Sequence, residues 1–120
     1  MDKEDMKRRT KQFALRVIRL VESLPNGRTA EVIGRQLLRS GTSVGANYRA
    51  ACRAKSTADF IAKMGTVEEE ADESSYWMEL LVEAEIVKAD RLESLMKEAD
   101  ELLAITVASV NTAKKRSRKE

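Results

Sequence analysis

The chain has 120 residues, the size of one domain, of which 42% are hydrophobic, 35% charged and only 4% aromatic. Its net charge of +2 is unevenly spread: residues 1–60 hold 13 Lys/Arg against 6 Asp/Glu (+7), residues 61–110 hold 4 against 13 (−9), and residues 111–120 hold 5 against 1 (+4). With no histidine and one cysteine, Cys52, the sequence lacks the commonest general base and excludes both a thiolate zinc cluster and an internal disulfide.

The first predicted helix runs from about Asp5 to Leu24. Apolar residues recur there every three or four positions with Lys and Arg between them, which is the pattern of an amphipathic helix. Leu24 precedes Pro25, and the residue before a proline is pushed out of helical conformation. The turn at 25–27 therefore ends this helix. Its apolar face consists of Phe13, Val17, Leu20, Val21 and Leu24.

The second predicted helix starts at Thr29 as its N-cap. Gly34, Gly41 and Gly45 lie beside its apolar face, although each glycine weakens a helix by about 1 kcal/mol relative to alanine. This stripe predicts either close packing of another backbone or a bend at 40–43 in one helix. The apolar face consists of Ile33, Leu37, Ser40, Val44, Tyr48 and Ala51.

The third predicted helix begins at Ser56, with Asp59 placed for a reciprocal cap. Its apolar side chains alternate spacings of four and three over three heptads, which indicates a coiled-coil-like seam. The seam consists of Phe60, Met64, Val67, Ala71, Ser74, Met78 and Leu81.

The fourth predicted helix has Asp90 as N-cap and Glu93 at the reciprocal position. Its seam consists of Leu92, Leu95, Ala99, Leu102, Thr106 and Ser109. From Lys114 the sequence is a charge run without periodicity, so we expect a bundle domain at 1–113 and a basic, disordered tail at 114–120. Four amphipathic helices with short connections predict an all-α, antiparallel up-down four-helix bundle.

No segment predicts a membrane span or a secretion signal. Residues 1–11 are charged and lack the apolar core of a signal peptide. The longest uncharged runs, 40–48 and 102–113, are far shorter than the roughly 20 apolar residues that cross a bilayer. We therefore expect a cytoplasmic protein, in which the free Cys52 serves in packing.

The sequence offers no catalytic or metal site. It has no glycine-rich loop of the kind that cradles a nucleotide. The acidic residues at 68–70, 72 and 73 could hold a hard cation, but a solvated or ion-paired helix face is the favoured interpretation. We predict no enzyme activity, no metal and no cofactor.

An apolar surface on the third predicted helix is wider than one core requires. Ile61, Trp77, Leu80 and Val82 flank the seam, and excess apolar surface usually marks an interface. These four residues predict a homo-oligomer interface, with coverage by neighbouring helices as the alternative. Tyr76 and Trp77 point about 100° apart, so a joint stacking platform for bases is disfavoured.

Arginines line one side of the second predicted helix, at Arg35, Arg39, Arg49 and Arg53. They could follow a phosphate backbone or, as we weigh more strongly, pair with carboxylates of the third helix. The candidate carboxylates are Glu69, Glu73 and Glu79. Asn47 is expected to be buried and to bond across to Ser74 or Glu70.

Two further basic segments favour a nucleic-acid partner. The first predicted helix carries Lys7, Arg8, Arg9, Lys11, Arg16 and Arg19, and the tail adds five more cations. The residues predicted to bind nucleic acid are Arg16, Arg19, Arg35, Arg39, Arg49, Arg53, Lys114, Lys115 and Arg116.

Residues 36–56, QLLRSGTSVGANYRAACRAKS, resemble the hallmark segment of the bacterial four-helix-bundle proteins encoded in intervening sequences of 23S ribosomal RNA genes. Residues 59–63, DFIAK, and 70–81, EADESSYWMELL, continue the resemblance, which covers roughly 13–105. Many relatives carry an acidic residue where this chain has Ala50.

This resemblance implies a bundle assembled into a ring, a homopentamer. The chain is also similar to the accessory variability protein of diversity-generating retroelements, a pentameric bundle that binds nucleic acid and cooperates with a reverse transcriptase. We therefore expect a non-enzymatic homo-oligomeric scaffold that binds RNA or DNA electrostatically, as an accessory to an RNA- or retroelement-related process. The alternative is a protein-interaction or assembly module with no nucleic-acid role.

Overall fold

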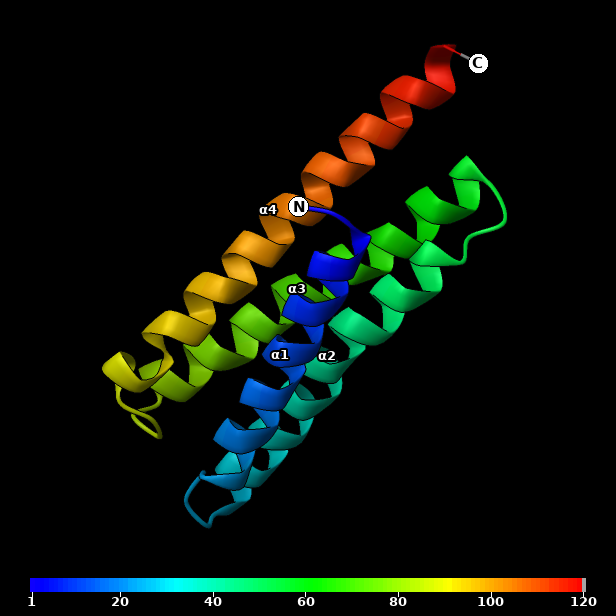
Figure 1. Cartoon of the computed structure of the whole chain (residues 1–120). Helices are drawn as coiled ribbons and strands as arrows, with labels where there is room; N and C mark the ends of the chain where they lie inside the picture. Colours follow the sequence, from blue (N-terminus) through cyan, green and yellow to red (C-terminus); the bar gives the residue numbers. More distant parts are fainter. Residues whose placement is uncertain (120) are drawn as a thin grey trace.

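The computed structural model describes residues 1–119, which form four α-helices joined by short turns (Figure 1). The helices are α1 (Lys3–Glu22), α2 (Arg28–Cys52), α3 (Thr57–Glu83) and α4 (Ala89–Lys119). Each helix packs against the next along the chain in a rod of 53 × 21 × 21 Å. The prediction of an all-α, up-down four-helix bundle is confirmed.

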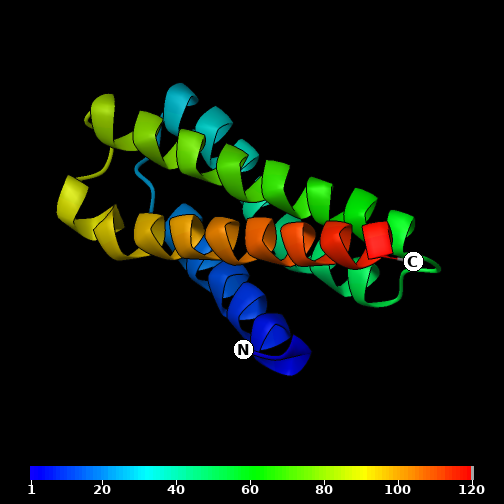
Figure 2. The same cartoon turned by 90° about the horizontal axis from the view of Figure 1, so that it is seen from above.

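The bundle closes least tightly between its first and last helices. The contact of α1 with α4 is the weakest of the four neighbouring pairs. Figure 2 shows why, because α1 runs obliquely and its N-terminal end turns away from α4. Polar side chains bridge the two helices, with Arg16 Nη2 donating to Ser94 Oγ at 2.9 Å and Arg91 Nη2 donating to Ser23 Oγ at 2.9 Å.

The core lies on the seams that the sequence predicts. In α3 the seam is buried from Met64 to Leu81, and in α4 it is buried from Leu92 to Thr106. The buried face of α1 begins nearer the N-terminus than predicted. It includes Thr10 and Met6, which are 1% and 3% exposed, in addition to the predicted residues from Phe13 onward. No helix within residues 1–119 combines the length and apolar character that a bilayer crossing requires.

The glycines of α2 face α1, as close packing predicts. A Cβ added at Gly41 would lie 2.8 Å from both Cγ atoms of Val17, and one added at Gly34 would lie 2.9 Å from Leu24 Cδ1. At Gly45 the same atom would lie 3.2 Å from Thr10 Oγ1. The glycines thus let the two backbones approach, and α2 is a single helix through this region.

The predicted helix caps are partly wrong. Ser56 is the N-cap of α3, and its Oγ accepts a hydrogen bond from the Asp59 N–H at 3.0 Å, as predicted. Thr29 is not the cap, because the N-cap of α2 is Gly27, two residues before the predicted position, and its φ of 150° suits glycine. Asp90 lies in the first turn of α4 instead of at its N-cap, since that helix begins at Ala89.

α4 is longer than predicted. Residues 114–119 continue the helix to Lys119, where the sequence predicts a disordered tail, and Glu120 lies outside the described residues. Alanine, lysine and arginine all have high helix propensity, and no glycine or proline interrupts the run. Cations near a helix C-terminus are also favoured by the helix dipole. The charge run therefore continues the helix beyond the apolar seam.

Candidate nucleic-acid interface

The antiparallel order of the helices separates positive from negative charge along the rod. The start of α1, the end of α2, the start of α3 and the end of α4 all lie toward the same end of the rod (Figure 1). We call residues 1–13, 46–67 and 105–119 the basic end; they hold 14 Lys/Arg against 4 Asp/Glu, a net charge of +10. The remaining described residues, 14–45 and 68–104, hold 8 against 15, a net charge of −7.

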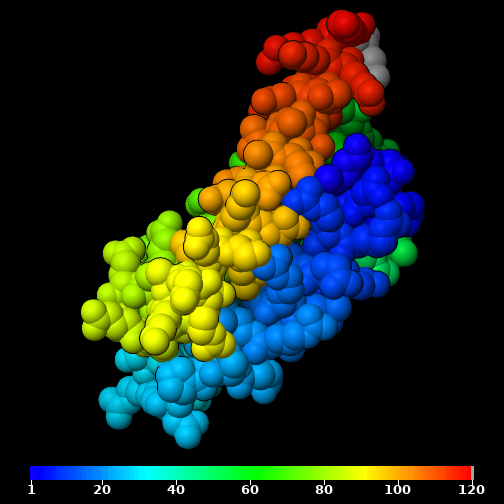
Figure 3. Space-filling model, turned by 60° about the vertical axis from the view of Figure 1, so that its left-hand side comes forward, coloured from blue at the N-terminus to red at the C-terminus, as the bar shows by residue number. Residues whose placement is uncertain are grey.

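The last turns of α4 extend the basic end beyond α1. Figure 3 shows α1 beside α4, with the final turns of α4 projecting past the start of α1. Lys114, Lys115 and Arg116 lie on these turns and are exposed. Their charges can therefore meet an anion in solution without displacing other parts of the chain.

A groove between α1 and α2 opens at the basic end. It has a volume of about 400 Å³. Three small residues of its lining, Ala14, Gly45 and Ala46, are called the floor of the groove below. Lys7, Lys11 and Arg49 stand around it. Among residues 1–119, Lys7 pairs with Glu4 at 3.4 Å, whereas Lys11 and Arg49 form no ion pair. The groove is lined by Glu4, Lys7, Arg8, Thr10, Lys11, Ala14, Thr42, Gly45, Ala46 and Arg49.

Sequence reasoning did not assign Lys7 and Lys11 to the predicted site. Both were recognised as basic residues of the first helix, but nothing in the sequence of that helix says what faces them. The sequence nevertheless contains a signal for this site. Lys7 and Lys11 are one turn apart and so share a face of α1, and antiparallel packing sets the start of α1 beside the end of α2. The pairing of Thr10 with Gly45 then sets Lys11 opposite the Ala46–Arg49 segment.

The predicted arginine stripe of α2 divides into two groups. Arg39 Nη1 lies 3.3 Å from Glu70 Oε2 of α3, and Arg39 also pairs with Glu73, which is one of the predicted carboxylates. Arg35 pairs with Glu31 of its own helix at 2.8 Å. Arg49 and Arg53 instead lie at the basic end and pair with no carboxylate among the described residues.

The predicted site residues of α1 lie away from the basic end. Arg16 is held against α4 through Ser94. Arg19 is exposed nearer the C-terminus of α1, in the part of the rod with net negative charge. Arg9, at the basic end, is bound to α4 by Glu98, with Arg9 Nε 3.0 Å from Glu98 Oε2. Of the predicted residues, five therefore belong to the basic end and four lie outside it. The five are Arg49, Arg53, Lys114, Lys115 and Arg116, and the four are Arg16, Arg19, Arg35 and Arg39.

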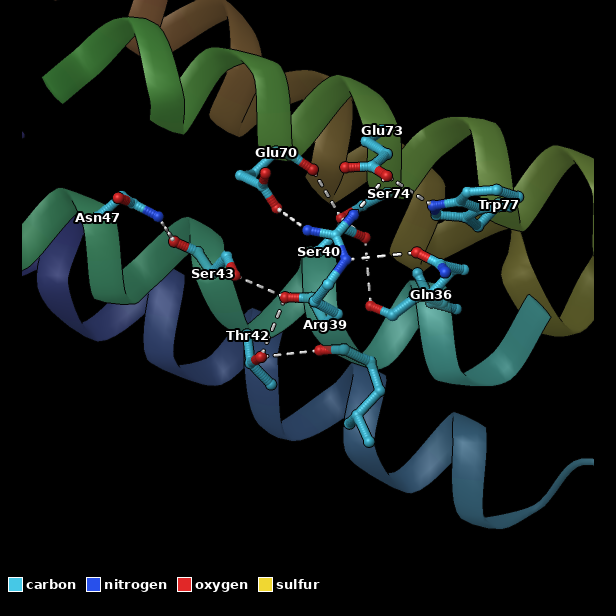
Figure 4. A network of polar contacts seen from close by, with 12 residues as sticks. Gln36, Arg39, Ser40, Thr42, Ser43, Asn47, Glu70, Glu73, Ser74 and Trp77 are labelled. Carbon is cyan, nitrogen blue, oxygen red and sulfur yellow. Dashed lines mark hydrogen bonds and ion pairs between the residues drawn. The ribbon is translucent and has the colours of Figure 1, made fainter. Parts of the chain in front are cut away.

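A polar network joins α2 to α3 near the middle of the rod (Figure 4). Ser74 Oγ donates to Ser40 Oγ across the core at 3.0 Å, and both hydroxyls are fully buried. Nearer the surface, Trp77 Nε1 donates to Glu73 Oε1 at 3.3 Å beside Arg39. These contacts fix the register of the two helices, and Arg39 contributes to them by pairing with carboxylates of α3.

The hydrogen-bond partner predicted for Asn47 is wrong. Asn47 is half-buried, but its Nδ2 donates to the Ser43 carbonyl oxygen of its own helix at 2.8 Å, and not to Ser74 or Glu70 (Figure 4). A carbonyl one turn earlier satisfies the amide without help from α3. Ser40, which was predicted only as part of the apolar face, makes the contact to Ser74.

We expect Glu70→Gln to raise the free energy of unfolding at pH 7 by less than about 1 kcal/mol. Burial holds the pKa of Glu70 above its usual value of 4.5, despite the nearby Arg39 guanidinium. A raised pKa means that the ionised carboxylate destabilises the folded state, and this penalty disappears as pH falls through the folded-state pKa. The advantage of Gln over Glu should therefore shrink on acidification and vanish below pH 4.5.

Urea unfolding of the two proteins between pH 4 and pH 7 measures this difference. Glu73→Gln is the control, because Glu73 pairs with Arg39 and also accepts from Trp77, so its neutralisation should give no gain. A Glu70→Gln protein less stable than the wild type at pH 7 would show that the ion pair with Arg39 outweighs burial.

The four residues of the predicted oligomer interface do not form one patch. Trp77, Leu80 and Val82 are half-buried and pack against the core of the same chain. Ile61 is also half-buried, but 16 residues separate it from Trp77, which places it about 160° around α3. Tyr76 is 52% exposed and meets the Trp77 ring edge-on, with centroids 5.2 Å apart. The neighbouring helices thus cover part of the surface that the sequence assigned to an interface.

Comparison with known proteins finds the same fold and a family. The family model described as 23S rRNA-intervening sequence protein matches residues 2–108. The chain is 36% identical to a protein of unknown function from the S23 ribosomal protein family of Bacteroides thetaiotaomicron VPI-5482. The crystal structure of that protein has a TM-score of 0.86, with 92% of this chain and 99% of that chain covered. No curated protein matches. Since the family match spans most of the bundle, the chain belongs to the 23S rRNA-intervening sequence protein family.

Proposed function

We propose that this protein is a non-enzymatic, homo-oligomeric scaffold that binds nucleic acid electrostatically through the basic end. The observation that carries the proposal is the charge separation: three basic segments, far apart in the sequence, share one end with a net charge of +10. Clustered cations that release counterions from phosphates supply most of the affinity of sequence-independent nucleic-acid binding.

The exposure of the basic end supports this proposal. The cations of 114–119 are exposed on a helix, Arg49 is exposed on α2, and Arg53 is exposed directly after the end of α2. The ring-shaped homopentamer that the family resemblance implies would repeat this surface in each subunit. If the helices stand parallel to the ring axis, all basic ends face the same side, and multivalent contact then strengthens the binding without any new type of contact.

RNA is the first nucleic acid to test. The family description refers to an intervening sequence of 23S rRNA. The basic end offers no element for reading base edges, so it positions phosphates instead of selecting a sequence. A role as an accessory in an RNA- or retroelement-related process is consistent with such binding.

The test is fluorescence anisotropy with a labelled ribosomal RNA hairpin and a DNA duplex, titrated from about 50 to 200 mM salt. We expect affinity to fall with salt, with a slope of about −4 or steeper in a plot of log K against log salt for the duplex, because each phosphate contact contributes about −0.9. Absence of binding to both probes at the lowest salt would refute the proposal.

A protein-interaction or assembly module is the second candidate. It is favoured by Val32 and Tyr76, which are 54% and 52% exposed on α2 and α3, away from the basic end. In this case Arg39→Glu should loosen the bundle and lower its melting temperature, since Arg39 joins α2 to α3 within the chain. Neutralising the cations of 114–119 should then change neither assembly nor partner binding.

A further inference from the structure

We propose that the groove between α1 and α2 is a subsite for single-stranded nucleic acid, which seats one nucleotide with its phosphate between Lys11 and Arg49. This inference rests on the proposed function and specifies the form of nucleic acid that the basic end takes. Its volume of about 400 Å³ lies within the range of about 300–1,000 Å³ for small-ligand sites.

Charge complementarity identifies the anionic part of the ligand. Lys11 projects from α1 and Arg49 from α2, and both line the groove and are exposed. Neither is paired with a carboxylate in the described part of the chain. The single carboxylate of the lining, Glu4, is engaged with Lys7 at 3.4 Å. A phosphate can therefore approach these two cations without first breaking an ion pair.

The floor of the groove favours a single strand over a duplex. Ala14, Gly45 and Ala46 contribute small, uncharged surface to the lining between the two helices. A single strand can lay a sugar or an unstacked base on that surface while its phosphate contacts the cations. A duplex hides its bases in the stack and offers only phosphate, so the floor adds nothing to its binding. Since no aromatic side chain lines the groove, we expect little selectivity among bases.

The groove can be filled without a change of charge. Ala46 is exposed on α2, and leucine is a good helix former, so Ala46→Leu blocks the floor and keeps the helix. The matched control is Ala62→Leu, the same substitution at an exposed position of α3 that also belongs to the basic end but lies outside the groove. A second pair is Arg49→Gln in the groove against Arg28→Gln, an exposed position at the opposite end of α2 that lies outside both the groove and the basic end. Circular dichroism would confirm that all four variants remain folded.

The binding assay uses a labelled 12-nucleotide oligouridine and a DNA duplex of the same length at low salt. We expect Ala46→Leu and Arg49→Gln to weaken oligouridine binding about fivefold or more, while Ala62→Leu and Arg28→Gln stay within about twofold. Duplex binding should change less than twofold with Ala46→Leu. Equal losses in the groove variants and their controls would overturn the groove assignment and leave the basic end as a diffuse surface. If the wild type binds neither probe, the proposed function fails as well.

Discussion

Reversing three charges at the end of α4, with Lys114→Glu, Lys115→Glu and Arg116→Glu, should weaken binding of an RNA hairpin about 100-fold or more at low salt. These side chains are exposed on the last turns of the helix and are not part of the hydrophobic core. The triple variant removes three phosphate contacts and adds three repulsions. The salt dependence should also become shallower, because fewer counterions are released.

The control reverses three charges elsewhere, with Arg19→Glu, Arg28→Glu and Arg35→Glu. These residues are also exposed, and they belong to the part of the rod with a net charge of −7. Both triple variants lower the net charge by six, so a difference between them reports position and not total charge. We expect the control to lose no more than about tenfold, through long-range repulsion that salt screens.

Equal losses in the two variants would contradict the proposed interface. That result would mean that affinity follows the total charge of the protein, with no particular surface in contact with RNA. A larger loss in the control would return the binding site to the side of α1 and α2 that carries Arg19 and Arg35. Thermal unfolding of both proteins would separate either outcome from loss of the fold.

The buried seams were predictable from the sequence because their cause is local. Residues spaced three and four apart share one face of a helix, and that face must leave water wherever the helix packs. Met78 and Leu81 on α3 and Leu102 on α4 are accordingly 0% exposed. The helix starts were less predictable, because Gly27 and Thr29 both suit the position and only the backbone conformation decides between them.

The candidate site was only partly predictable because it is assembled from distant segments. The same arginine stripe contains Arg39, which two carboxylates of α3 engage, and Arg49, which lines a groove with α1. Spacing within α2 cannot distinguish these environments, since each is set by a neighbouring helix. The basic end was within reach, however. Up-down topology alone places the start of α1 and the end of α4 toward the same end of the rod. Summing the charges of the half-helices that share an end, instead of those of consecutive segments, therefore identifies the basic end from the sequence.

Gly41→Ala should lower the stability of the bundle, whereas the same substitution at Gly65 should raise it. At Gly41 the new Cβ would lie 2.8 Å from both Cγ atoms of Val17, which is 0% exposed and, being β-branched, has little rotamer freedom. Overpacking of this kind costs about 1–3 kcal/mol and outweighs the gain in helix propensity of about 1 kcal/mol. At Gly65 the new Cβ meets nothing within 4 Å, so only the propensity gain remains.

Thermal unfolding of the two variants tests how closely the α1 and α2 backbones pack. Both variants carry the same chemical change in the middle of a long helix, so a difference in melting temperature reports the surroundings of the new Cβ. We expect Gly41→Ala to melt several degrees below Gly65→Ala, at about 4 °C for each kcal/mol. Equal melting temperatures would mean that Val17 yields easily and that α1 is loosely held. Since α1 meets α4 only weakly, the glycine-lined contact with α2 is what keeps Lys7 and Lys11 beside Arg49. A loosely held α1 would therefore also remove the groove.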